Sequence, residues 1–318
     1  MARNKVQIQK GLSEVDFLRL YGSEEACRAA VFGWRWPDGF ECPACGGHDH
    51  CVLDRRDLYQ CNACRTQTSL TAGAIFANTK LPLTTWLRAM YLLTQTKQGI
   101  STVELGRRLG VRQTTAWAMK SKLTQVMLER DAKKLLDGRV EMDDAYLGGR
   151  RSDGKTGRGA SGKTPFVASV ETTDEGKPKR VQLRRVKRFT KKAIKALAGR
   201  TLKPTARVVT DGLGCFHGLR GSVEAHDRLI VAHLGHAEKL PQFQSVNTVL
   251  GNIKSAITGT YRAVRKHADR TLAEFEWRFN RRYDLAAMIP RLAWAATRTP
   301  PMPYRLLKMA DSGGSAGI

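Results

Sequence analysis

The sequence has no long hydrophobic run. No stretch approaches the roughly 18–20 consecutive apolar residues that a membrane-spanning helix needs. The N-terminal stretch MARNKVQIQK also lacks the apolar segment of a secretory signal. We therefore expect neither a membrane span nor a signal peptide. The chain has 318 residues, 42% of them hydrophobic, which is enough to bury a core in one or two domains.

Acidic residues are scarce. The 29 Asp and Glu residues stand against 54 Lys and Arg residues, so the formal net charge is +25. A surface that repels itself this strongly usually has a polyanionic partner. We predict that the partner is nucleic acid, with a merely basic or ribosome-like protein as the alternative.

Four of the seven cysteines form two CxxC pairs, Cys42 with Cys45 and Cys61 with Cys64, with fifteen residues between the pairs. Each pair can form a tight turn that points two thiolates at one ion, and four thiolates complete a closed tetrahedral site. The spacing predicts a zinc ribbon with structural Zn2+. A redox CxxC would need a single pair beside a βαβ unit, which is missing. Less favoured substitute ligands are His48, His50 and Cys51.

Two short helices are predicted over residues 12–36, with Ser13 and Ser23 as N-caps. A longer helical pattern covers residues 83–126.

Within that longer pattern the sequence predicts a helix-turn-helix. Ser101 and Glu104 form a capping box, and Gly110 ends the first helix. The second helix is predicted from about Gln113 to Lys122. A plain helical hairpin is the alternative. The residues predicted to be available to bases and phosphates are Arg112, Gln113, Thr114, Thr115 and Lys120.

A polar stretch at 131–138 reads as a linker, and the pattern then changes to short strands rich in Val. Strands followed by mixed strand and helix predict an α/β or α+β domain around a central sheet. The predicted strands cover 139–147, 166–170, 181–186 and 207–210, with a helix over 191–197.

Residues 157–164, GRGASGKT, match the phosphate-binding pattern GxxxxGK[ST]. That loop needs a strand before it and a helix after it, so that helix amides can cradle phosphate. Here a basic, glycine-rich run precedes the match, and Pro165 with a strand-like segment follows it. We predict a basic loop between two strands rather than an ATP site.

Two aspartates lie where strands end. Asp143 lies in the strand that precedes Gly148, and Asp211 ends another strand just before Gly212. Two such carboxylates suit Mg2+, which takes one or two protein carboxylates plus substrate phosphates. Paired ions would activate an attacking water or 3′-hydroxyl and stabilise the leaving oxygen. Taken singly, either aspartate would more often be a turn or cap residue.

Asn247 and Lys254 are seven residues apart in a helical segment. Seven residues at about 3.6 per turn come almost full circle, so both side chains share one helix face. An oxygen ligand and a cation placed in this way would hold a metal ion and a nearby phosphate.

Motifs spread over nearly the whole chain carry a family resemblance. They are Arg35-Trp36-Pro37-Asp38-Gly39, Asp143-Asp144 before Tyr146 and Gly148-Gly149, Thr210-Asp211-Gly212, Asn247 with Lys254, Gly259-Thr260-Tyr261, and the run from Glu274 to Arg282. With these motifs the chain resembles the zinc-ribbon insertion-sequence transposases of the DDE superfamily, insertion-sequence family fifteen ninety-five. The resemblance implies a ribonuclease-H-like fold and a cut-and-join reaction on the element's own terminal repeats. It also implies that Asp143 and Asp211 are the first two acidic metal ligands.

The third ligand position departs from the wider superfamily, which has Glu seven residues before the Lys. Here it is Asn247, as in the Asp-Asp-Asn-Lys variant of the family. A neutral amide is a weaker ligand for a hard cation than a carboxylate. Strand alternation predicts that the Asp144 side chain points to the face opposite Asp143. Glu238 and Glu274 are the rival third ligands.

Two further features are assigned packing roles. A loop or packing role is predicted for His226, His233 and His236. For the arginine-rich helix over 273–282 we predict core packing with a basic face exposed to solvent.

These observations predict a DNA transposase with structural Zn2+ and catalytic Mg2+ or Mn2+, with two catalytic ions expected. Expected partners are double-stranded DNA, as terminal inverted repeats and target, and other copies of the chain in a synaptic complex. A cytoplasmic, nucleoid-associated location in a prokaryote follows. The rivals are an inactive DNA-binding relative and a structure-specific nuclease. The predicted segments are an N-terminal helical segment (1–38), zinc ribbon (39–72), helix-turn-helix region (73–135), catalytic domain (136–290) and C-terminal tail (291–318).

Overall fold

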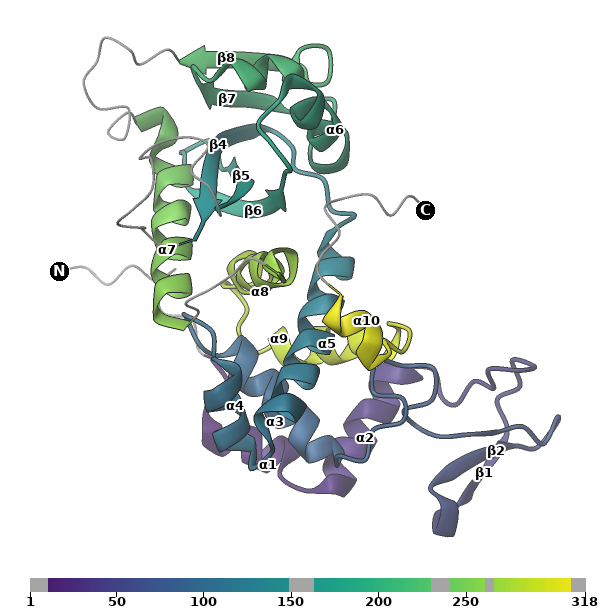
Figure 1. Cartoon of the computed structure of the whole chain (residues 1–318). Coiled ribbons are helices and arrows are strands. Elements are labelled where there is room, and N and C mark those ends of the chain that lie inside the picture. Colours follow the sequence, from purple (N-terminus) through teal and green to yellow (C-terminus); the bar gives the residue numbers. More distant parts are fainter. Residues whose placement is uncertain (1–10, 149–162, 230–240, 261–265, 310–318) are drawn as a thin grey trace. The chain divides into compact units, whose positions relative to one another are not determined.

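A computed structural model describes residues 11–148, 163–229, 241–260 and 266–309 (Figure 1). The chain divides into two compact units, each built from segments that are not consecutive in sequence. The first unit contains Met1–Thr96, Ile100–Val126 and Tyr283–Lys308, and the second contains Lys97–Gly99, Met127–Arg282 and Met309–Ile318. No helix within the described ranges is both long enough and apolar enough to span a bilayer.

The first unit begins with two capped helices, α1 (Glu14–Tyr21) and α2 (Glu24–Arg35). Both predicted N-caps are confirmed. The Ser13 hydroxyl accepts a hydrogen bond from the third residue after it at 3.0 Å, and the Ser23 hydroxyl does the same at 3.1 Å. These bonds satisfy amides that have no partner inside the first helical turn.

A small antiparallel sheet follows, with β1 (His50–Leu53), β2 (Leu58–Cys61) and β3 (Gln67–Thr68) in that order. Its core is shared with the helices of the unit. Buried Phe40 and Tyr59 belong to the same apolar cluster as Val31 of α2 and Leu83 of α3 (Leu83–Thr94). The ribbon therefore gains packing from its surroundings in addition to any bound ion.

The predicted helix-turn-helix is present as α4 (Thr102–Leu109) and α5 (Gln113–Asp131). Ser101 caps α4, and Gly110 ends it in the left-handed region with φ +67°. The second helix runs about two turns further than predicted, to Asp131. One predicted DNA contact is wrong: Lys120 is 6% exposed, and its ammonium donates to the Ile100 carbonyl at 2.5 Å. Lys120 lies one turn after buried Ala116, on the face of α5 that packs inward.

The second unit contains a five-stranded sheet with the order β6-β5-β4-β7-β8. β4, β5 and β6 pair antiparallel, whereas β7 and β8 run parallel to β4. The mixed α/β fold class and the four predicted strands are confirmed. The strands are β4 (Arg139–Leu147), β5 (Thr164–Thr172), β6 (Pro178–Arg185), β7 (Arg207–Asp211) and β8 (Ala225–Leu229).

We did not predict β8, because its sequence, AHDRL, has no apolar alternation. Residues 157–162 of the phosphate-loop match lie outside the described residues. The last residue of the match, Thr164, begins β5, so a strand follows where a phosphate-binding loop requires a helix.

Helices cover both faces of this sheet. On one face, α6 (Lys191–Thr201) and the short helix Gly214–Leu219 pack on Met142 and Val208. On the other face, α7 (Gln244–Thr260) and α8 (Ala268–Asn280) pack on Ala145 and Val209. Figure 1 shows α7 beside the sheet, where it contacts β4 and β5. Because side chains alternate along a strand, Asp143 and Asp211 belong to the α7 face.

The arginine-rich segment lies mainly in α8, and its charges are buried rather than offered to solvent. Glu274 pairs with Arg278 at 2.6 Å, and both side chains are less than one-tenth exposed. Arg281 pairs with Asp131 at 2.7 Å, so the start of the predicted 131–138 linker is anchored inside the second unit. The predicted packing role is confirmed for this segment, but the expected basic face is wrong, because Arg278 and Arg281 are buried in ion pairs.

The predicted tail differs from the structure. Residues 291–318 include most of α9 (Met288–Thr297) and all of α10 (Tyr304–Lys308). In α9 the apolar residues Ile289 and Leu292 are fully buried, and Ile289 joins the core of the first unit. This helix is short and rich in Ala, so its buried face was not visible as a strong apolar period.

Candidate metal centres

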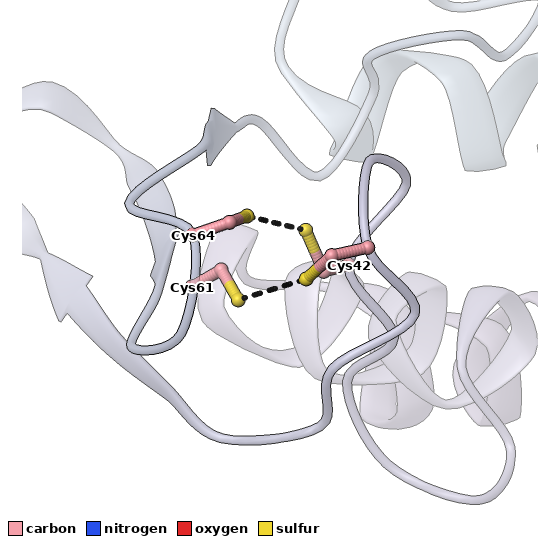
Figure 2. A group of neighbouring side chains, drawn as sticks. Cys42, Cys61 and Cys64 are labelled. Carbon is pink, nitrogen blue, oxygen red and sulfur yellow. Dashed lines mark hydrogen bonds between the residues drawn. The ribbon is translucent and has the colours of Figure 1, made fainter.

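The four cysteines of the two CxxC pairs form one cluster. Each offers a sulfur atom, and these atoms all lie within 4.8 Å of one another. Figure 2 shows Cys42, Cys61 and Cys64 with their side chains pointing toward one another. The sulfurs of Cys42 and Cys64 are 3.6 Å apart. The sulfurs of Cys45 and Cys61 are also 3.6 Å apart. Zinc–sulfur bonds of about 2.3 Å in a tetrahedron require roughly 3.8 Å between sulfurs, so the arrangement fits one Zn2+.

Two similar turns aim the thiolates. After the first pair, the Gly46 amide donates to the Cys42 carbonyl at 2.9 Å, and after the second the Arg65 amide donates to the Cys61 carbonyl at 3.0 Å. Both turning residues have positive φ, +71° at Gly46 and +56° at Arg65. The CxxC spacing therefore acts locally, because each turn orients its own two sulfurs.

The substitute ligands have other positions. His48 lies with Nδ1 at 3.0 Å from the Phe40 carbonyl. The ring of His50 packs on Phe40 and Tyr59. Cys51 is exposed on β1. Among the described residues, the cluster at this place contains the four CxxC cysteines and none of the substitutes.

A second cluster contains three carboxylates: Asp143, Asp144 and Asp211. Each has an oxygen within 4.8 Å of an oxygen from the others, and all three side chains are half-buried. β4 and β7 pair as far as Met142 and Thr210, so Asp143 and Asp211 come directly after the last bonded pair. The two parallel strands thus bring together aspartates that are far apart in the sequence.

The Asp144 carboxylate lies closer to those of Asp143 and Asp211 than we predicted. Alternation places it on the α6 face, yet its carboxylate reaches the same cluster. β4 is no longer paired with β7 at this point, and the Asp144 amide donates to Asp143 Oδ1 at 2.8 Å. The open end between the two strands leaves room for the Asp144 side chain to turn toward the others. Our expectation that Asp144 points away from the site is therefore wrong.

Polar groups around Asp211 hold the end of β7. The Leu213 amide donates to Asp211 Oδ1 at 3.1 Å, and Arg228 donates to the Gly212 carbonyl at 2.7 Å. On β8, His226 Nε2 lies 2.9 Å from the Thr210 hydroxyl. Burial, followed by the charge of Arg228, lowers the pKa of His226 and keeps this imidazole neutral near physiological pH. His226 therefore packs in a strand, as predicted.

Asn247 lies in the first turn of α7, and Lys254 lies two turns later. The preceding residue, Val246, donates its amide to Glu141 on β4 at 2.9 Å, which places this turn against the strand that carries Asp143. Asn247 is half-buried and Lys254 is exposed. At about 100° per residue, the two side chains are about 20° apart around the helix axis, beside the apolar stripe that packs on the sheet.

The rivals for the third ligand have different positions. Glu274 is 2% exposed and is paired with Arg278 at 2.6 Å, so its carboxylate already has a cationic partner. Glu238 lies outside the described residues, as do His233 and His236.

The helix-turn-helix presents a polar surface in the first unit. Arg112, Gln113 and Thr114 are exposed at the start of α5, and Thr115 is half-buried. The first turn of a second helix is the part that contacts base edges in this motif.

Two family models match the chain. The model described as an ISXO2-like transposase domain matches residues 135–280, and the model described as a transposase zinc-ribbon domain matches residues 22–67. The first range contains the three carboxylates with Asn247 and Lys254, and the second contains all four CxxC cysteines. Together the two ranges span more than half of the chain. No curated protein matches it.

Proposed function

Because this chain belongs to the zinc-ribbon insertion-sequence transposases of family fifteen ninety-five, in the DDE superfamily, we propose that it cleaves and joins DNA at the ends of its own insertion sequence. Its second unit has the ribonuclease-H-like fold, and its first contains the zinc ribbon. The observation that carries the proposal is the convergence of Asp143, in the middle of β4, and Asp211, at the end of β7, directly after the last paired residues of these two parallel strands.

The carboxylate cluster fits a hard divalent cation. Asp143 and Asp211 would hold Mg2+ or Mn2+, and Asp144 lies close enough to serve as an additional ligand. When bound, such ions polarise phosphate oxygens and lower the pKa of a coordinated water or hydroxyl. The three side chains are only half-buried, so phosphate oxygens of DNA and water would complete the coordination that Mg2+ prefers.

Asn247 and Lys254 would act beside the carboxylates. The Asn247 amide oxygen would serve as the third protein ligand, and as a neutral group it would bind more weakly than a carboxylate. The Lys254 ammonium, exposed on the same flank of α7, would hold a phosphate of the DNA end. The expected reaction is hydrolysis at the element end, followed by attack of the freed 3′-hydroxyl on target DNA.

The first unit would recognise the terminal inverted repeats. The exposed polar residues at the start of α5 would read the major groove, and the net charge of +25 would favour the phosphate backbone. Joining two element ends requires at least two active sites close together, so we propose a synaptic complex of several copies. The proposed segments keep the predicted boundaries at 38, 72 and 135, but not the one at 290, which would divide α9.

One assay separates the proposal from its rivals. Purified protein is incubated with terminal-repeat DNA and Mg2+ or Mn2+, and nicked and joined products are resolved. Joining supports a transposase, nicking alone a structure-specific nuclease, and binding alone an inactive DNA-binding relative. Asp143→Asn and Asp211→Asn should abolish cleavage but keep binding, whereas Asp227→Asn, at an exposed position of β8, should cleave normally. Normal cleavage by either of the first two variants would overturn the proposed site.

Asn247→Ala should lose less cleavage activity than the two aspartate variants, because a neutral ligand contributes less than a carboxylate to the binding of a hard cation. A loss equal to that of the aspartate variants would contradict this ranking.

A further inference from the structure

Glu141 is a buried carboxylate on the strand that carries Asp143. It is 1% exposed and lies two residues before Asp143, on the same face of β4. Its Oε1 accepts from the Arg139 guanidinium at 2.7 Å, and its Oε2 accepts from the Val246 amide at 2.9 Å. One side chain thus joins the strand of the first aspartate to the turn of α7 that contains Asn247.

The start of α7 is held at two further points. Arg139 also donates to the Gln242 carbonyl at 3.1 Å, and the Ser245 hydroxyl donates to the Gly176 carbonyl at 2.8 Å. The amides of a first helical turn have no partner within the helix, and the positive end of the helix dipole lies there. A buried carboxylate satisfies both requirements, and Glu141 is the acidic member of this set of contacts, beside the basic Arg139.

We propose that Glu141 is a positioning residue for the metal site. It fixes the first turn of α7, which contains Asn247, against the strand that carries Asp143. This inference rests on the proposed function, because it concerns how the third ligand is placed. Groups that orient metal ligands in this way typically contribute about 10–100-fold to metal affinity or activity.

A direct ligand role for Glu141 is disfavoured by its contacts. Both carboxylate oxygens already accept hydrogen bonds, one from Arg139 and the other from Val246. Among the described residues, the carboxylate cluster contains Asp143, Asp144 and Asp211 but not Glu141. Its effect on the metal would therefore pass through the position of Asn247.

The test uses the zinc-loaded, full-length protein, so that the cysteine site is already filled. Mn2+ binding is titrated by paramagnetic resonance of the free ion, and exchange at the Val246 amide is followed by hydrogen–deuterium exchange. For Glu141→Ala we expect Mn2+ affinity to fall about 10–100-fold and the Val246 amide to exchange faster. For Glu141→Gln, whose amide oxygen can still accept from Val246, we expect a smaller, several-fold loss of affinity.

Glu171 provides a matched control. It is 5% exposed on neighbouring β5 and pairs with Lys179 at 2.8 Å, and it accepts a hydrogen bond from the Asp137 amide at 3.4 Å. Glu171→Ala also removes a buried, ion-paired carboxylate, but it should leave Mn2+ affinity within about twofold of wild type. If Glu141→Ala does not fold, Glu141→Gln carries the comparison against Glu171→Gln.

The outcomes separate this inference from the proposed function. Wild-type Mn2+ affinity in both Glu141 variants, or an equal loss in the Glu141 and Glu171 variants, would overturn the positioning role. If the wild-type protein binds Mn2+ no better than Asp143→Asn does, the proposed metal site itself fails. Loss of affinity in the Glu141 variants alone, with faster Val246 exchange, supports both.

Discussion

Replacing Asp211 by Asn should stabilise the metal-free protein while removing its metal response. The three clustered carboxylates lie within 4.8 Å of one another. At that distance two unit charges repel by about 0.9 kcal/mol in water and by about 3.5 kcal/mol at an effective dielectric constant of about 20. Because the side chains are half-buried, and therefore partly screened, we take about 1 kcal/mol for each pair.

Asp211→Asn removes two of these repulsive pairs, so the gain should be about 2 kcal/mol. The Asn side chain keeps an oxygen that can accept from the Leu213 amide, as Asp211 Oδ1 does at 3.1 Å. For a unit of this size, 2 kcal/mol raises the midpoint of thermal unfolding by about 4–8 °C. Mg2+ at a hundredfold excess over its Kd should in turn stabilise the wild-type protein by about 2.7 kcal/mol, but not the variant.

Differential scanning calorimetry with and without Mg2+ tests both parts, in buffers without chelator so that zinc is retained. Asp227→Asn is the control, because it removes a negative charge from an exposed position of β8 outside the cluster. The reasoning is refuted if the Asp211 and Asp227 variants shift the metal-free midpoint equally. It is also refuted if Mg2+ stabilises the Asp211 variant as much as it stabilises the wild-type protein.

Three other changes test the remaining chemistry. Cys61→Ser should lose bound zinc in elemental analysis, because a closed tetrahedral site needs four ligands; Cys51→Ser should retain one zinc per chain. Glu276→Ala should lower the free energy of unfolding in urea by about 3 kcal/mol, since it leaves the Arg184 guanidinium without its partner at 2.6 Å; a loss below about 1 kcal/mol would contradict this. Burial lowers the pKa of His226 from 6.5, so the unfolded state binds protons more readily. The stability that this neutral imidazole contributes is complete above pH 6.5 and is lost as pH falls through the folded-state pKa. The free energy of unfolding in urea, measured at about pH 7.5 and about pH 5.5, should therefore depend less on pH in His226→Gln than in the wild-type protein. An unchanged difference between the two pH values would contradict this role of His226.

Local hydrogen bonding made much of the fold predictable. Ser13, Ser23 and Ser101 cap their helices, and Gly110 ends α4, because a cap depends on residues within one turn. The strands of the second unit were predicted because their apolar residues are continuous along the chain. β8 was missed because its residues are polar and its place depends on pairing with β7.

Contacts between segments far apart in the sequence accounted for the positions at which the structure differs from the predictions. Lys120 was predicted to face DNA, but the packing of α5 turns it toward the Ile100 carbonyl. Asp144 was predicted to point away, but the separation of β4 from β7 lets it join the carboxylates. The link from Glu141 to Val246 spans 105 positions in the sequence, so no local pattern could indicate it.

The sequence alone determined the cysteine site and the candidate aspartates. A CxxC turn orients its own thiolates within four residues, and a strand ending in Asp before Gly is a local pattern. Tertiary structure decided which carboxylates meet, how many meet, and what holds α7 beside them. Those outcomes depend on strand order and helix docking, which are set by the packing of segments far apart in the chain.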